Sequence, residues 1–365
     1  MIATVLQATA PQATALQAVA LQAVALQAVV DTTDRHVIAR LGALCFFLSA
    51  IEFMIPKPLP FLRIGLANLP LMLAVAILPL RGYAALVLVK LFGQALVGGT
   101  LFSWIFLFSL AGTISSATIM YLLKKTLRSH ISYVGISVAG AFASNAAQLF
   151  IAQQFIFGEG ARLVAPPFLL AGIVSGTLLG FFTNHIAATS RWYAQAKAGT
   201  LQPQPAPAII ASSKESSSAR LLTALTLIIA LLFSPSLFLT AGITALSFLL
   251  LLISKTRVHL LPAIITAVSI LVFNLLVPFG KVLAQPFSFP ITQGALLLGI
   301  KKALILEGML FLSRWALAGT KSFPGVRSGI LSEMFAFLAV LTSHKNKITR
   351  KNLVASIDKI MFERA

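Results

Sequence analysis

The sequence has few charged residues and very few acidic ones. Of its 365 residues, 9 are Asp or Glu and 28 are Lys or Arg, which gives a formal net charge of +19. Charged residues make up 10% of the chain, whereas soluble domains contain about a quarter. The chain therefore lacks the polar surface of a water-soluble globular protein, and we predict that lipid is its solvent.

The same scarcity excludes several kinds of chemistry. The three aspartates are Asp31, Asp34 and Asp358, so no paired aspartate-rich motif could hold Mg²⁺ against a diphosphate. No Gly-x-x-x-x-Gly-Lys-Ser/Thr phosphate loop is present. The single Cys45 and five scattered histidines offer no zinc-type ligand spacing. We therefore predict no catalytic residue, no metal site, no cofactor and no ATP hydrolysis by this chain alone.

Long apolar runs are the most abundant feature of the chain. They are 17 to 25 residues long, enough for a helix to cross a hydrocarbon core about 30 Å thick. None shows the apolar/polar alternation of a spanning strand. We predict an all-α polytopic membrane protein whose first six spans cover residues 37–55, 62–80, 83–99, 101–123, 131–154 and 166–188.

Basic residues lie in short clusters between the apolar runs. This placement indicates membrane topology and argues against a nucleic-acid-binding face. With a cytoplasmic N-terminus, the inner segments of the six-span unit hold eight Lys or Arg residues, whereas the outer loops hold Lys57, Arg63 and Arg162. The positive-inside rule favours that orientation. We predict a multi-pass inner-membrane protein with its N-terminus in the cytoplasm.

Composition divides the chain into five predicted regions. Residues 1–34 contain five tandem pentapeptides of the Leu-Gln-Ala-Val-Ala type, whose period matches neither helix nor strand. A six-helix membrane domain at 35–190 precedes a Pro-, Gln- and Ser-rich linker at 191–219. A second membrane domain of about three to five helices covers 220–345, and residues 346–365 form a basic cytoplasmic tail suited to anionic lipid.

Within the second domain, residues 221–253 predict a helical hairpin that is interrupted at Pro235, and a further helix follows at 259–280. The next apolar segment, 291–318, contains too many charges for a lipid-facing helix: Lys301, Lys302, Glu307 and Arg314. We expect it to pack against protein or to lie along the interface. A last apolar helix is predicted at 328–343.

Deletion of residues 1–30 is expected to leave membrane insertion and any transport unchanged. The pentapeptides form no helix-period apolar face and lack the basic start of a signal peptide. The amount of protein in isolated membranes, compared with that of the full chain, measures this. Loss of insertion in the deletion variant would show that the repeats are needed.

Polar side chains inside the predicted spans are candidates for a binding site, because each is costly to bury in lipid. Lys90 and Gln94 lie four residues apart on one helix face, and Asn145 and Gln148 lie three apart on another. Asn68 lies near the start of the second span. The alternative interpretation is that the amides hold helices together.

Lys90 is the most informative of these residues, because it lies in the middle of a span. Its ammonium must be balanced by a carboxylate, by amide oxygens or by a bound anion. Glu52 is the only acidic residue in the six spans, and the predicted topology places it too close to the outer surface for a direct pair. The remaining partners are Gln94, Asn145, Gln148 and an acidic group of a ligand.

Several motifs resemble the Gx transporter family. Residues 58–74 read Pro-Leu-Pro-Phe-Leu-Arg-Ile-Gly-Leu-Ala-Asn-Leu-Pro-Leu-Met-Leu-Ala, with the proline, basic residue and Gly-Leu-Ala-Asn box that enter the second helix of that family. The segments Val89-Lys-Leu-Phe-Gly-Gln, Leu110-Ala-Gly-Thr-Ile-Ser-Ser and 135–149 are similar to its later helices. The resemblance covers about residues 37–190.

The resemblance implies the six-helix, substrate-binding S component of an energy-coupling-factor (ECF) vitamin transporter. It implies a small vitamin- or precursor-like solute as substrate, separate ATP-binding subunits and a transmembrane T component as partners. The small face of the first helix, Ala39 and Ala43, would contact the T component. The positions that match substrate-binding polar residues are Asn68, Lys90, Gln94, Asn145 and Gln148.

Two further points keep other functions open. Residues 220–345 faintly resemble a T component, chiefly at 292–308, but lack its Ala-Arg-Gly-type coupling motifs. The Gx transporter family is also labelled component I of heptaprenyl diphosphate synthase. The alternatives to transport are therefore a non-catalytic membrane component of that synthase and a structural scaffold.

Overall fold

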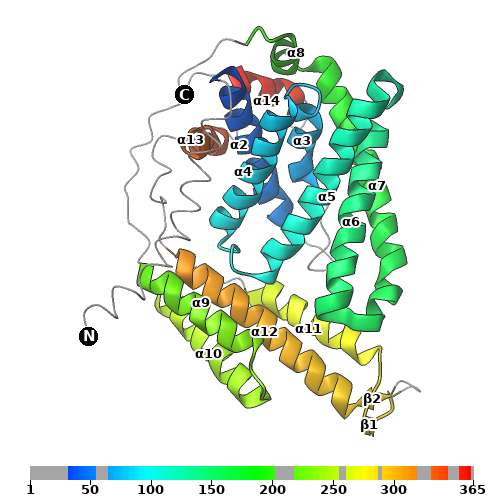
Figure 1. The fold of residues 1–365 in the computed structure, drawn as a ribbon, viewed down its shortest axis with the longest axis vertical. Helices are drawn as coiled ribbons and strands as arrows, with labels where there is room; N and C mark the ends of the chain where they lie inside the picture. The colour runs from blue at the N-terminus through cyan, green and yellow to red at the C-terminus, as the bar shows by residue number, and fades with distance from the viewer. Residues whose placement is uncertain are drawn as a thin grey trace.

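The computed structural model describes residues 32–54, 65–201, 218–254, 260–286, 290–318, 330–343 and 353–362. This described part is almost entirely helical, with one short two-stranded ribbon, so the prediction of an all-α protein is confirmed. Figure 1 shows a first unit of roughly upright helices and a second, oblique group of helices at one end of it. The pentapeptide repeats lie outside the described residues.

The first unit is built from long helices; the first two run in the same direction, and the later ones alternate in direction (Figure 1). They are α2 (Thr32–Met54), α4 (Leu80–Gly98), α5 (Trp104–Leu127), α6 (Tyr133–Ala152) and α7 (Ala161–Thr189). Each overlaps one predicted span, so helices form at five of the six predicted positions.

The remaining predicted span, 62–80, which is the second in the sequence, is broken. Its described residues form a 3₁₀ turn, η1 (Leu66–Asn68), and a six-residue helix, α3 (Leu69–Ala74). Gly65 precedes the turn with a φ of 89°, which favours glycine, and Pro79 disfavours helix just before α4. Six residues give about 9 Å of helix. The prediction of one continuous helix over 62–80 is therefore wrong.

Glycines allow α7 to pack closely against α6. Gly172, Gly176 and Gly180 lie four residues apart, on one face of α7. A Cβ added at Gly180 would lie 2.4 Å from the Cα of Val134, and one added at Gly176 would lie 3.1 Å from the carbonyl oxygen of Ser137. Both neighbours are backbone atoms, so α6 and α7 can lie this close together only because glycine has no side chain.

The second unit surrounds one central helix. α12 (Gln293–Leu317) contacts α9 (Ser218–Leu232), α10 (Leu237–Ile253) and α11 (Leu260–Leu275). A short ribbon of β1 (Val282–Ala284) and β2 (Ile291–Thr292) precedes α12. The predicted hairpin with its break at Pro235 is confirmed, as is the expectation that the charged helix packs against protein.

The two units meet at an irregular stretch between α6 and α7. It consists of a π-helix, η3 (Gln153–Phe157), and a 3₁₀ turn, η4 (Gly158–Gly160). The carbonyl oxygen of Ile156 accepts hydrogen bonds from Lys302 Nζ at 2.8 Å and from Asn274 Nδ2 at 3.2 Å. A π-helix shifts the backbone hydrogen-bond register. This carbonyl thus joins η3 to α11 and α12 of the second unit.

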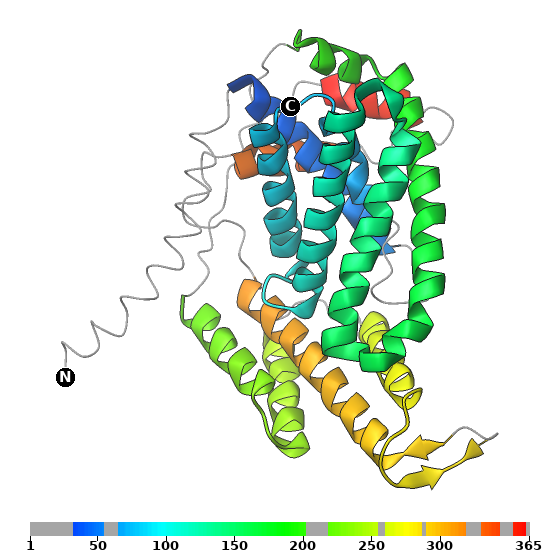
Figure 2. The same cartoon turned by 45° about the vertical axis from the view of Figure 1, so that its right-hand side comes forward.

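The last two helices return to the first unit, as Figures 1 and 2 show. α13 (Ile330–Ser343), which confirms the helix predicted at 328–343, packs against α2. α14 (Leu353–Phe362) packs against α8 (Arg191–Ala198). Asp358 of α14 accepts a hydrogen bond from the Ser190 hydroxyl and another from the Arg191 backbone N–H at 2.6 Å. A carboxylate at this helix N-terminus stabilises α8.

α8 occupies the start of the predicted linker. Trp192, Tyr193 and Ala196 are buried in the core of the first unit, which explains why these residues are helical despite the polar composition around them. Burial raises the pKa of the Tyr193 hydroxyl above its usual range. Its hydrogen bond with Tyr133 therefore joins two neutral hydroxyls and attaches α8 to α6.

Candidate functional site

A polar cluster lies where α2, η1 and α4 meet in the first unit. Lys90 of α4 donates a short hydrogen bond to Oδ1 of Asn68, at the end of η1. Glu52 of α2 accepts a hydrogen bond from the backbone N–H of Gly65 at 3.2 Å. Lys90 is 2% exposed and Glu52 6% exposed. The structure thus brings together two predicted residues, Asn68 and Lys90, in an otherwise apolar core.

The broken helix explains how Asn68 reaches Lys90. Gly65 turns the chain with its left-handed φ, and its carbonyl accepts a hydrogen bond from the N–H of Asn68 at 2.8 Å. The 3₁₀ turn then ends at Asn68, immediately before α3. This helix break was not predicted from the sequence. It supplies the amide oxygen that accepts the hydrogen bond from the Lys90 ammonium.

Gln94 lies one helical turn beyond Lys90 on α4. Its Nε2 donates to the backbone carbonyl of Cys45 on α2 at 3.5 Å, at the outer limit of a hydrogen bond. Cys45 itself is fully buried. Gln94 therefore faces the same α2 and α4 boundary as the cluster, and among the described residues this weak contact uses only part of its hydrogen-bonding capacity.

Of the other two predicted residues, Asn145 joins two helices of the first unit, and Gln148 forms its hydrogen bond within its own helix. Asn145 Nδ2 donates to the carbonyl of Phe168 on α7 at 2.9 Å. Gln148 Nε2 donates to the Ser144 hydroxyl at 3.0 Å, on its own helix, and faces Gly112 of α5. These contacts fit the alternative interpretation of the amides. Gln148 Oε1 is nevertheless buried without a hydrogen bond in the described part, so it could accept one from a ligand.

The predicted contact residues Ala39 and Ala43 are inside the chain. Both are 0% exposed. They lie in the part of α2 against which α13 packs, and the side chain of Met334 occupies the space beside Gly42. The small-residue face of α2 is therefore close-packed within this chain.

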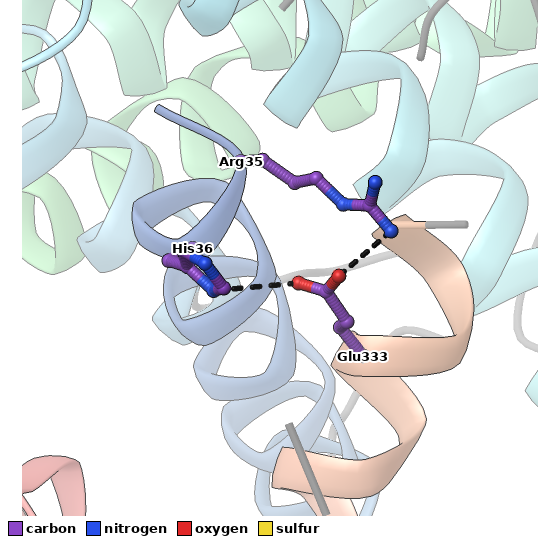
Figure 3. Close-up of polar contacts among 3 residues, drawn as sticks. All are labelled: Arg35, His36 and Glu333. Carbon is purple, nitrogen blue, oxygen red and sulfur yellow. Dashed lines mark ion pairs between the residues drawn. The ribbon is translucent and has the colours of Figure 1, made fainter. Parts of the chain in front are cut away.

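Polar contacts at one end of α2 orient α13, and sequence reasoning missed them. Glu333 of α13 pairs with Arg35 at 2.7 Å and with Nδ1 of His36 at 3.7 Å (Figure 3). The Arg40 guanidinium lies 5.0 Å from the ring centroid of Phe337, within cation–π range. The only available signal was that Glu333 is a rare acidic residue in an apolar helix, which marks it as needing a partner.

Among the described residues, no three His, Cys, Asp or Glu side chains are grouped closely enough to hold a metal ion. Lys57 and Arg63, two of the outer basic residues, lie outside the described residues. The assembled site is thus a buried ammonium with a neighbouring carboxylate and two amides. Such a site can bind a small polar solute through charge and hydrogen bonds, but it contains no nucleophile and general-base pair.

Some of the described helices have the length and the apolar composition of membrane spans. Two helical stretches, Trp104–His130 and Tyr133–Thr189, are long and apolar enough to cross a membrane. Residues 41–186 match the family model described as heptaprenyl diphosphate synthase component I, and residues 216–319 match a domain of unknown function. The first match supports the family label that the motifs of the first unit indicated. No match was found among curated proteins or among solved structures.

Proposed function

We propose that the chain is a multi-pass membrane protein of the ECF type that binds a small vitamin- or precursor-like solute for uptake. The observation that carries this proposal is the buried cluster of Glu52, Asn68 and Lys90. Burying an ammonium in an apolar bundle costs several kcal/mol, about 3 on insertion scales. Binding of a polar solute by this cluster of charged and amide groups accounts for keeping that cost.

The surface of the first unit supports a membrane location. Leu163, Leu170, Val174, Leu178 and Phe181 of α7 are each more than half exposed and lie on one stripe of the helix. From Leu163 to Phe181 the stripe is about 27 Å long, close to the hydrocarbon thickness. Water would not tolerate so long an apolar surface, whereas lipid tails would cover it.

In this proposal the solute contacts Asn68, Lys90 and Gln94, with Asn145 and Gln148 on the neighbouring helix as further hydrogen-bonding groups. The first three are supported by their placement around one buried charge. ATP-binding subunits are separate chains, because this sequence contains no phosphate loop. The resemblance to ECF transporters adds a T component as a further partner. Membrane lipid covers the outer faces.

A second function is favoured by the name of the matching family. A component I of heptaprenyl diphosphate synthase would be a non-catalytic membrane partner of a separate catalytic chain. The few aspartates agree with a role that involves no prenyl transfer by this chain. Purification of the tagged protein from membranes distinguishes the two functions: ATP-binding subunits should be recovered for transport, and a prenyl diphosphate synthase for the alternative.

Native mass spectrometry of gently purified full chain tests the binding proposal. We expect a population whose mass exceeds that of the protein by one small solute, and tandem fragmentation should release an anionic species. Collisional activation should remove the solute before the chain unfolds. Protein that is always solute-free, even when purified from cells grown in rich medium, would count against a solute-binding first unit.

Topology gives an independent prediction. Reporter tags after Lys125 and after Lys197 should be cytoplasmic, and a tag near Gly158 should be external, because most basic residues of the six-span unit lie at the opposite end from Gly158. Protease or thiol-reagent accessibility in intact cells measures this. A periplasmic signal at Lys125 would refute the proposed orientation.

A further inference from the structure

Glu307 is a buried carboxyl group in the second unit that the proposed function does not use. Its side chain lies on the central helix α12 and is 7% exposed. Within the described residues, neither Oε1 nor Oε2 has a hydrogen-bond partner. It is also the only acidic residue between positions 216 and 319. No second carboxyl group of this segment can therefore lie beside it.

Hydroxyl groups on the facing helix are already engaged. Thr244 of α10, which lies beside Gly308, donates to the carbonyl of Leu304 at 2.9 Å. Ser247 donates to the carbonyl of Ile243 at 2.6 Å. Leu306 and Leu310, neighbours of Glu307 on α12, are buried apolar residues. In the described part of the chain, the carboxyl group is therefore buried beside apolar side chains, and no donor forms a hydrogen bond with it.

Positive charges nearby do not form an ion pair with Glu307. Arg314 lies two helical turns further along α12 and interacts with Glu307 electrostatically, but no ion pair joins them in the described part of the chain. Lys302 donates to Ile156 O at 2.8 Å and to Asn274 Oδ1 at 3.2 Å. The ammonium of Lys302 is thus engaged elsewhere.

The helices packed around α12 add little further charge. α10 and α11 contain no charged residue, and the only one on α9 is Arg220, which is exposed. Lys301 is directed to the carbonyl of Pro235 at 3.3 Å. The connection at 255–259, with Lys255, Arg257 and His259, lies outside the described residues.

We propose that Glu307 is a proton-binding site: its carboxyl group holds a proton in the folded chain. An ionised carboxylate without donors pays a large desolvation cost, several kcal/mol even after relaxation. The neutral acid pays only the smaller cost of an unpaired polar group, about 1–3 kcal/mol. This inference does not depend on the identity of the transported solute.

A carbodiimide detects such a group directly. The protonated carboxyl adds to dicyclohexylcarbodiimide: its proton moves to one nitrogen while its oxygen bonds to the central carbon, and the acyl group then migrates to nitrogen. The product is a stable N-acylurea, and no atom is lost in the addition. This apolar reagent should reach buried acids, whereas a water-soluble carbodiimide should react with exposed ones.

We expect dicyclohexylcarbodiimide to modify Glu307 of the full chain in nanodiscs, with less adduct at high pH than at low pH. Peptide mass spectrometry locates the adduct, which should be lost in Glu307→Gln. Glu159, which is exposed and paired with Arg162, is the matched control: Glu159→Gln should leave the Glu307 adduct unchanged. Addition of NaCl or KCl at constant pH should not protect Glu307.

Two results would overturn the proposal. If Glu307 reacts in denatured protein but not in the folded chain at any pH, the group is not a protonated acid in an apolar site. If Na⁺ or K⁺ abolishes the adduct, Glu307 binds a metal cation and not a proton. Because the adduct is measured on the unmodified sequence, the test remains decisive even if Glu307→Gln fails to fold.

Discussion

Replacement of Lys90 by methionine should abolish solute retention and uptake while the protein still accumulates in the membrane. The substitution removes the charge that donates to Asn68 in the buried cluster. A hydrogen bond to a charged group contributes about 1.5–3 kcal/mol, so affinity for an anionic solute should fall at least about tenfold. Insertion should not suffer, because methionine is far less costly than lysine in a span.

Lys125→Met is a suitable control for this experiment, since it removes one positive charge from an exposed position at the end of α5. It should retain solute as the unmodified chain does. Asn68→Leu should weaken retention in the same direction as Lys90→Met, because it removes the amide that orients the ammonium. A Lys90→Met protein that retains solute normally would make Lys90 a structural residue and would remove the argument for an anionic substrate.

Gly180→Ala should destabilise the first unit markedly. The new methyl carbon would lie 2.4 Å from the Cα of Val134 and 3.1 Å from the carbonyl oxygen of Tyr133. Since both are backbone atoms, α7 must move away from α6, and overpacking of this kind costs about 1–3 kcal/mol or more. Thermal unfolding in detergent, followed by tryptophan fluorescence, should show a lower midpoint temperature.

Gly242→Ala is the matched control on α10, because no atom would lie within 4 Å of its added methyl group. Alanine has the higher helix propensity, by about 1 kcal/mol, so this variant should unfold at the same temperature or higher. Equal losses of stability in both variants would show that close contact between α6 and α7 does not determine the stability of the first unit.

The location of α13 bears on how a coupling subunit would contact α2. The resemblance assigns Ala39 and Ala43 to contact with a separate coupling subunit, whereas in this chain α13 packs against α2. A partner that uses this face must therefore displace α13 or contact α2 alongside it. The ion pair of Arg35 with Glu333 is the contact that such a partner would have to break (Figure 3).

Sequence alone determined approximately where most helices lie. Apolar runs are a local property, so the positions of α4, α6, α10 and α12 follow from run length, and Pro235 marks the break between α9 and α10. The break at Gly65 could not be distinguished from a continued span, because a single glycine is tolerated within many apolar helices. Its left-handed φ is apparent only in the folded chain.

Tertiary structure decided which polar residues meet. Helical spacing correctly placed Lys90 and Gln94 on one face, but the partner of Lys90 is Asn68, 22 residues away in the sequence. Asn145 and Gln148 were predicted to share that site, and instead their described hydrogen bonds lie within α6 and to α7. The packing of α13 against α2 could not be predicted from the sequence either. Helical periodicity specifies which face a side chain occupies, whereas the partner of that face depends on how distant helices pack.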